Sequence, residues 1–111
     1  MNKSKDEAQL QSSIIEWLYL HDIFHWRNNT GALKIGNRFV KFGFKGSPDI
    51  ICVYRGWFIG IECKSATGRQ SANQEDFEKK LKEAGGAYLL VKNIDTVINY
   101  FEDLFTVASL K

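Results

Sequence analysis

Two acids and a lysine near the middle of the chain have types and spacing that suit chemistry. Residues 57–64 read as a strand in which Glu62 and Lys64 share one face, roughly 6–7 Å apart. If Arg55-Gly56 forms a two-residue turn, Asp49 lies directly opposite Glu62, with Cβ atoms about 4.5–5.5 Å apart. Like charges at that distance destabilise a sheet, whereas a divalent cation between them reverses the sign. The spacing therefore indicates a candidate site for a hard cation.

This pairing depends on the turn at Arg55-Gly56, and an alternative stays open. Arg-Gly is a weaker turn signal than Asn-Gly, and a slip of one residue would separate Asp49 from Glu62. Both carboxylates could equally face water at strand ends, with Lys64 as a surface partner. Gly60 lies on the same face and has no Cβ, so we expect that face to be open to a substrate.

Hydrophobic patterning predicts the elements that must hold these residues. Apolar spacing and capping signals predict three helices, and period-two alternation or apolar runs predict the strands. The run at 87–91 suits a strand buried on both faces and parallel to its neighbour. The result is an α/β class, a mixed sheet flanked by helices. The predicted elements are helices at 6–21, 71–84 and 96–105 (the last capped by Asp95) and strands at 38–42, 49–54, 57–64 and 87–91, with 23–27 as a further short strand.

Composition bounds the class of protein. A length of 111 residues predicts one domain, 1–111. No apolar run long enough to span a membrane and no signal core occur, which predicts a soluble cytoplasmic protein. Cys52 and Cys63 fit no zinc spacing and are expected to be buried free thiols. His21 and His25 straddle the predicted end of the first helix, so no metal role is expected for them. A net charge of +2 permits nucleic-acid binding without demonstrating it.

At these residues a family resemblance emerges. Pro48-Asp49 followed by Glu62-Cys63-Lys64 resembles the PD-(D/E)xK nuclease signature. The chain as a whole resembles a stand-alone VRR-NUC (virus-type replication-repair nuclease) domain, on the segments EAQLQSSIIEWL, WRNNTGA, KGSPDI, IECKSATGRQSANQ and EAGGAYLLV. The resemblance implies a restriction-endonuclease-like αβββαβ core. It also implies hydrolysis of DNA phosphodiester bonds that depends on Mg²⁺ or Mn²⁺.

The resemblance also implies roles for individual residues. Asp49 and Glu62 would be metal ligands, together with the backbone carbonyl of Cys63. Lys64 would orient or activate the attacking water, or stabilise phosphate charge. Glu7 matches an acid of the first helix that reaches the metal, and Gln74 matches a glutamine that supports the site.

Two of these roles have structural alternatives, because both residues also match capping patterns. Glu7 stands three residues after Ser4, and Gln74 stands three residues after Ser71, so each could close a capping box instead.

DNA is the expected partner, contacted mainly through its phosphates. Taken individually, each cation fits a solvated surface charge better than a DNA contact, and the motif around residue 28 has a polar turn as its alternative. The expected substrate is branched, such as a four-way junction, cut by a homodimer. A flap, single-strand or nicking nuclease, or a DNA-binding module without catalysis, remains the alternative. The contact candidates are Arg27, Asn28, Asn29, Lys34, Arg38, Lys41, Lys45 and Arg69.

Aromatic and apolar residues outside the site carry further expectations. Trp17 and Trp26 are expected in the core. The late apolar residues could form a dimer interface or pack on their own sheet. These late residues are Phe101, Leu104, Phe105, Val107 and Leu110.

Overall fold

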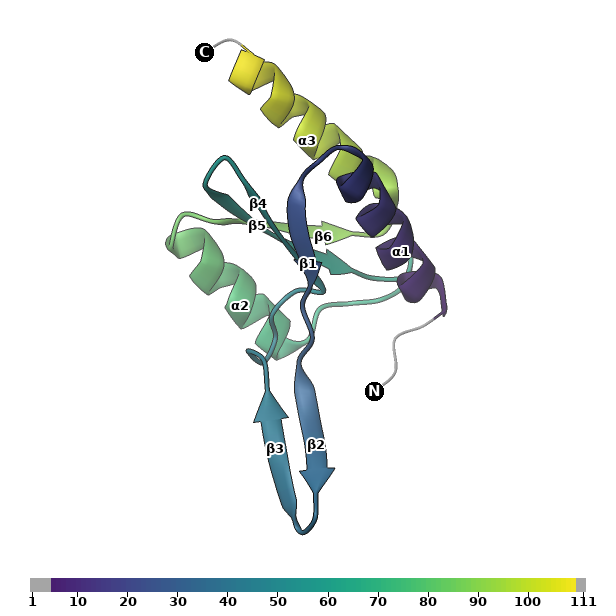
Figure 1. Cartoon of the computed structure of the whole chain (residues 1–111), viewed down its shortest axis with the longest axis vertical. Coiled ribbons are helices and arrows are strands. Elements are labelled where there is room, and N and C mark those ends of the chain that lie inside the picture. Colours follow the sequence, from purple (N-terminus) through teal and green to yellow (C-terminus); the bar gives the residue numbers. More distant parts are fainter. Residues whose placement is uncertain (1–4, 110–111) are drawn as a thin grey trace.

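A four-stranded mixed sheet forms the body of the molecule, and a separate two-stranded hairpin projects from it (Figure 1). The computed structural model describes residues 5–109, with side chains from 5 to 107. The elements in chain order are α1 (Lys5–Leu20), β1 (Phe24–Arg27), β2 (Gly31–Ile35), β3 (Arg38–Phe42), β4 (Ile50–Tyr54), β5 (Trp57–Cys63), α2 (Ala72–Glu83), β6 (Ala87–Val91) and α3 (Ile94–Ser109).

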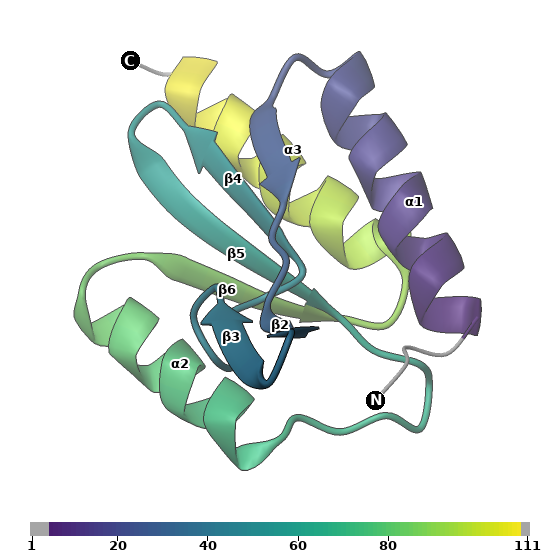
Figure 2. The ribbon, with the colours of Figure 1, turned by 60° about the horizontal axis from the view of Figure 1, so that its bottom comes forward.

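The strand order of the main sheet is β1-β4-β5-β6. Strand β4 runs antiparallel to both β1 and β5, and β6 runs parallel to β5. Helices α1 and α3 pack on one face of the sheet, and α2 lies against the other (Figure 2). The predicted α/β class and mixed sheet are therefore confirmed, as is the parallel pairing of 87–91. That strand lies at the sheet edge and leaves Leu90 39% exposed, so the prediction of burial on both faces was wrong.

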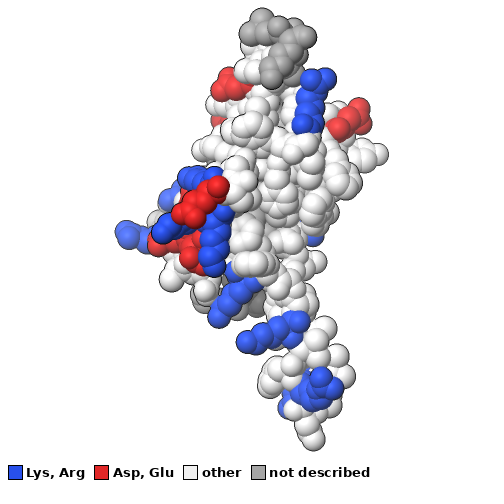
Figure 3. All heavy atoms as spheres, turned by 90° about the vertical axis from the view of Figure 1, so that its left-hand side faces the viewer, with Lys and Arg blue, Asp and Glu red and all other residues white. Residues whose placement is uncertain are grey.

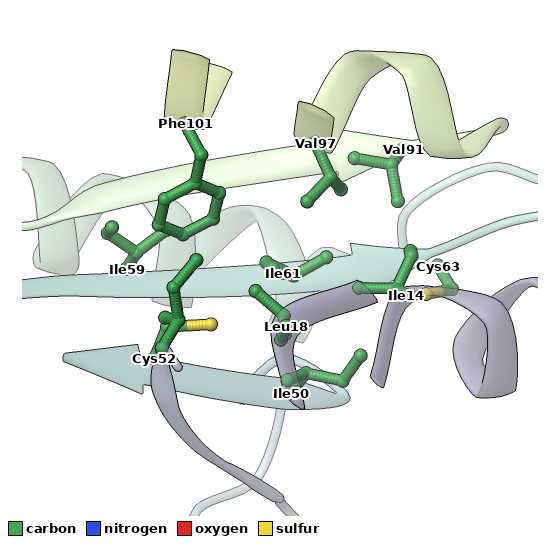
Figure 4. Packing of buried hydrophobic residues seen from close by; sticks show 11 residues of the cluster. Ile14, Leu18, Ile50, Cys52, Ile59, Ile61, Cys63, Val91, Val97 and Phe101 are labelled. Carbon is green, nitrogen blue, oxygen red and sulfur yellow. The ribbon is translucent and has the colours of Figure 1, made fainter. Parts of the chain in front are cut away.

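The hydrophobic core fills the space between the sheet and helices α1 and α3 (Figure 4). Alternation along β5 sends Ile59, Ile61 and Cys63 into this layer, so the residues between them face α2. Cys52 and Cys63 are buried free thiols, as predicted. Burial raises the pKa of the Cys52 thiol to about 12, which keeps it neutral. The helices contribute Ile14, Leu18, Val97 and Phe101 to the layer.

The turn at Arg55-Gly56 decides the register of β4 on β5, and it is a two-residue hairpin turn. Both residues have positive φ, 51° and 83°, as a type I′ turn requires. Tyr54 therefore pairs with Trp57, and Ile50 pairs with Ile61. This is the predicted register, so the next residue outward, Asp49, falls beside Glu62.

Strand β2 was missed at the sequence level, and its hairpin with β3 is the largest departure from the predicted fold. The two strands pair from Gly31↔Phe42 to Ile35↔Arg38, with Gly36 (φ +63°) in the turn. They do not join the main sheet, and all ten strand residues are exposed.

Helix α3 departs from its predicted bounds at both ends. It begins at Ile94 rather than after Asp95, because the side chain of Asn93 accepts a hydrogen bond from the Thr96 backbone N–H. It continues past Phe105 to Ser109 because no Gly or Pro stops it. No helix within residues 5–109 is long and apolar enough to cross a membrane.

The aromatic and late apolar residues divide between the core and the surface. Trp17 packs against the core, as predicted, but Trp26 is 41% exposed on the edge strand β1, so that prediction was wrong. Phe101 is buried, and Leu104 and Phe105 pack against the core. Val107 is exposed, and Leu110 lies outside the described residues.

Candidate active site at the end of the central strands

A groove of about 490 Å³ opens where β4 begins and β5 ends. Five parts of the chain line it: helix α1, the segment before the hairpin, the loop before β4, the end of β5, and the start of α2. Two acids lie in its wall, and the rest of its polar lining consists of amides, hydroxyls and one lysine. The lining residues are Gln11, Asn28, Asn29, Thr30, Lys45, Gly46, Ser47, Asp49, Glu62, Ser71, Asn73 and Gln74.

Asp49 is held by the strand that it faces. Its Oδ2 accepts a hydrogen bond of 2.8 Å from the backbone N–H of Cys63. Pro48 is buried against the face of Gly60, where an added Cβ would come within 2.6 Å of the proline Cγ. The expectation that Gly60 leaves this face open to a substrate was therefore wrong. The missing Cβ accommodates Pro48, which holds Asp49 next to β5.

Glu62 is the one charged residue buried among those described, and it is only 1% exposed. A buried carboxylate requires partners, because desolvation of an unpaired charge costs several kcal/mol. The Nε2 of Gln74 donates to its Oε2 at 3.1 Å. The Nζ of Lys64 lies 3.7 Å from the same oxygen, with the lysine side chain 13% exposed. Glu62, Lys64 and Gln74 thus form one contact group.

Gln74 fills both roles considered for it. Its Oε1 accepts from the Ser71 backbone N–H at 2.9 Å, while its own backbone N–H donates to the Ser71 hydroxyl at 3.2 Å. This is a complete capping box at the start of α2. A backbone N–H only donates and an ionised carboxylate only accepts, so the amide orientation is fixed. The cap therefore directs the Nε2 of Gln74 toward Glu62.

Glu7 reaches the end of β5 from α1. Its Oε2 accepts a hydrogen bond of 3.1 Å from the backbone N–H of Ser65, the residue after Lys64. The capping box with Ser4 lies outside the described residues. Within residues 5–107, no three His, Cys, Asp or Glu side chains are gathered so that they could hold a metal ion. Glu7 is thus beside the site without forming a three-acid cluster with Asp49 and Glu62.

The donor set fits a hard divalent cation. Asp49, directly before β4, and Glu62 on β5 both line the groove with carboxylate oxygens. Mg²⁺ and Mn²⁺ prefer oxygen ligands and accept few of them from protein. Glu62 is only 1% exposed, and a bound cation would favour the charged form of its carboxylate in that nearly dry position.

Asn28 is a clamp rather than a free surface amide. Its side chain donates to the Ser47 hydroxyl at 2.7 Å and to the Pro48 carbonyl at 3.0 Å. Its backbone N–H donates to the Asp49 carbonyl at 2.7 Å. Arg27 is bound to α1, through Gln11 and Ser12, so its guanidinium is already partnered.

The other candidate contact residues separate into two groups. Asn29 and Lys45 line the groove beside the acids. Lys34, Arg38 and Lys41 lie on the projecting hairpin, and Arg69 is exposed in the loop between β5 and α2. The structure places the first group in the groove with the acids, whereas the second group does not line that groove.

Gln11, Asn73 and Tyr88 are site neighbours that the sequence analysis did not single out. Gln11 and Asn73 line the groove. Tyr88 of β6 is buried and accepts a hydrogen bond of 3.3 Å from the side chain of Gln70. Burial raises the pKa of Tyr88 to about 12; the Gln70 bond lowers it, and nearby carboxylates, Glu62 first among them, raise it further. The parallel register that pairs Tyr88 with Gly60 brings it there, and no pattern in the sequence revealed that register.

Comparison with solved structures identifies the fold. One structure, titled "VRR_NUC domain", superimposes with a TM-score of 0.65 and 17% identity, covering 89% of this chain and 97% of its own. A second, "VRR_NUC domain protein", gives a TM-score of 0.59 and 18% identity, covering 92% and 89%. No family model and no curated protein matches the sequence. The resemblance expected from the sequence is thus confirmed at the level of the fold.

Proposed function

We propose that this protein is a metal-dependent nuclease that hydrolyses DNA phosphodiester bonds. One observation carries the proposal: Glu62, buried to 1% exposure, lies beside Asp49 and contacts Lys64 and Gln74 at the wall of an open groove. A merely structural strand would gain stability from an apolar residue at that position. The likeness to solved VRR_NUC domains supports the same assignment.

The proposed roles follow from the contacts. Asp49, Glu62 and the Cys63 carbonyl would hold Mg²⁺ or Mn²⁺, with Glu7 as a further carboxylate at the end of β5. The bound ion supplies an activated water and relief of charge on the phosphate. Lys64 would orient that water or stabilise the phosphate, since its Nζ lies at the same Glu62 oxygen. Gln74 acts as a positioning residue that holds the Glu62 carboxylate.

The proposed substrate is branched DNA, such as a four-way junction, and the proposed assembly is a homodimer. In the groove, Asn29 and Lys45 would contact a phosphate, and Arg69 would extend the contact along the backbone. A domain of this size has a small footprint, and two copies related by a two-fold axis would match a symmetric junction.

The test is cleavage of a labelled junction, flap, nicked duplex and single strand, with Mg²⁺, with Mn²⁺ and with chelator. Asp49→Asn should lower the rate on the order of 10³-fold, which corresponds to about 4 kcal/mol of barrier. Asp95→Asn, an exposed acid on α3, is the matched control and should cleave normally.

The outcomes separate the competing functions. Paired symmetric nicks in the junction support the proposal in full. Preference for a flap or a single strand replaces the branched substrate. Cleavage that survives both chelator and Asp49→Asn overturns the metal mechanism. Junction binding without cleavage in either metal assigns a DNA-binding role instead.

A further inference from the structure

The charge of the chain is unevenly distributed, and the hairpin lies at the centre of the imbalance. Residues 23–48 hold five of the fifteen cations and none of the thirteen acids. The remaining residues therefore carry ten cations against thirteen acids. Figure 3 shows Lys and Arg without Asp or Glu on the projecting end, in contrast to the mixed cluster beside it. The five cations are Arg27, Lys34, Arg38, Lys41 and Lys45.

The pairing of β2 with β3 places cations on both faces of the ribbon. Residues directly opposite each other share a face. Lys34 lies opposite Phe39, and both share their face with Lys41, whereas Arg38 lies opposite Ile35 on the other face. All five are exposed, and Phe39 is exposed to 73%. The ribbon thus presents positive charge in two directions and along its length.

The root of the hairpin is fixed to the candidate active site. Asn28 joins the outgoing leg to Ser47 and Pro48 of the returning leg. Where the legs cross, Gly43 comes so close that a Cβ would lie 2.5 Å from the carbonyl oxygen of Asn29. The direction of the hairpin is therefore set by the segment that carries Asp49.

We propose that the hairpin lies in the major groove of the DNA duplex that flanks the scissile phosphate, with its long axis along the groove. This inference rests on the proposed nuclease function and extends it to the surface that selects duplex. With side chains, a two-stranded ribbon is about 10 Å thick, close to the spacing of packed sheets. The major groove is about 12 Å wide and admits such a ribbon. Cations on both ribbon faces then meet the phosphates of both groove walls.

The length of the ribbon sets the footprint. Five residues per strand extend roughly 17 Å from the root. At 3.4 Å per base pair, the hairpin covers about five base pairs beside the cleavage point.

The exposed apolar residues of the ribbon suggest a competing occupant, a second copy of this chain. Leu33, Ile35 and Val40 share one face and are 58%, 61% and 40% exposed. The absence of acids over the whole segment favours DNA. Apolar burial against another copy needs no such charge pattern.

The test measures DNA binding in chelator, where cleavage does not interfere. A triple variant, Lys34→Gln with Arg38→Gln and Lys41→Gln, removes the three cations of the hairpin and is called the arm variant. Lys79→Gln with Lys80→Gln and Lys82→Gln removes the same charge from α2 as a control. The arm variant should reduce the slope of log affinity against log salt by about 2.7 for duplex, and the control should not. Shortening the DNA duplex beside the cleavage point to less than about five base pairs should weaken its binding to the wild-type protein. The same shortening should not weaken its binding to the arm variant.

Several results would overturn the proposal. They are an equal loss in both variants, no loss in the arm variant, or an equal loss on single-stranded DNA. Replacing Leu33, Ile35 and Val40 with Ser tests the other occupant. The hairpin is assigned to contact with a second copy if that variant changes from dimer to monomer and the arm variant binds DNA as well as the wild type does. If the wild type cleaves DNA and the arm variant binds DNA normally, only the hairpin proposal is rejected. If binding depends on the hairpin cations but no cleavage occurs, only the proposed nuclease function is rejected.

Discussion

The end of the central strands and the projecting hairpin are neighbours in sequence, yet different forces hold them. At the site, hydrogen bonds from other elements fix Asp49 and Glu62, and Glu62 is also buried. Along the hairpin, order comes from one strand ladder and a pinned root. An isolated two-stranded hairpin is only marginally stable in water. The hairpin would therefore gain stability from a partner.

The largest expected difference is in stability. Phe101→Ala removes a ring that is fully buried, so we expect a loss of about 3–5 kcal/mol in the free energy of unfolding. Phe39→Ala on the hairpin should change it by less than about 0.5 kcal/mol. Denaturant unfolding followed by circular dichroism measures both. A comparable loss for Phe39→Ala would show that the hairpin belongs to the core.

Glycine substitutions sharpen the same contrast. Gly60→Ala forces a Cβ to within 2.6 Å of Pro48, so overpacking should cost about 1–3 kcal/mol and displace Asp49. Cleavage should fall together with the melting temperature. Gly36→Ala meets nothing within 4 Å and strains only the turn at φ +63°, so the melting temperature of the body should not change. Equal effects of the two substitutions would argue against the packing role of Pro48.

Substitutions in the capping box separate the cap from the site. Ser71→Ala removes the cap, so it should lower the free energy of unfolding by about 1 kcal/mol. It should retain more cleavage activity than a substitution of Gln74. Gln74→Glu keeps an acceptor for the Ser71 N–H but loses the donor to Glu62 and adds a like charge. We expect a fall in cleavage of about 10–100-fold with a smaller loss of stability, by analogy with residues that support metal ligands. Similar losses of activity in both variants would mean that Gln74 acts only through the helix.

The smallest effect belongs to a surface pair on α2. Lys82 donates to Glu78 at 2.6 Å, and this hydrogen bond lowers the pKa of Glu78. A carboxyl group whose pKa is lowered by folding stabilises the protein at pH values above its ordinary pKa. This stabilisation is lost as the pH falls through the lowered pKa. The pair should contribute about 0.3–0.5 kcal/mol. Comparing acid unfolding of Lys82→Gln with wild type checks this, and an identical decline below the ordinary glutamate pKa would contradict it.

Local patterns were sufficient to predict the centre of the molecule. Alternation in 57–64 and the turn at Arg55-Gly56 together determined the register that puts Asp49 beside Glu62. The capping pattern from Ser71 to Gln74 was also visible in the sequence. These features depend on residues close together in the chain, so spacing alone constrains them.

Features that depend on distant contacts were not predictable. Nothing in the spacing shows that Pro48 fills the space over Gly60, or that Asn28 clamps the loop before Asp49. The strand at 31–35 was hidden because it follows a run of turn residues and pairs outside the main sheet. Trp26 is exposed because β1 lies at a sheet edge, which its composition does not reveal.

The two hydrogen bonds of the Gln74 side-chain amide, one to the Ser71 backbone and one to Glu62, have a consequence for how the site forms during folding. One side-chain amide closes the first turn of α2 and holds Glu62, so it cannot rotate to favour one partner without losing both. Assembly of the helix end and readiness of the carboxylate are therefore a single event. The rate at which the Ser71 amide hydrogen exchanges with solvent should therefore depend on whether Gln74 is bonded to Glu62. A ligand that binds Glu62 would change this exchange rate at the beginning of α2.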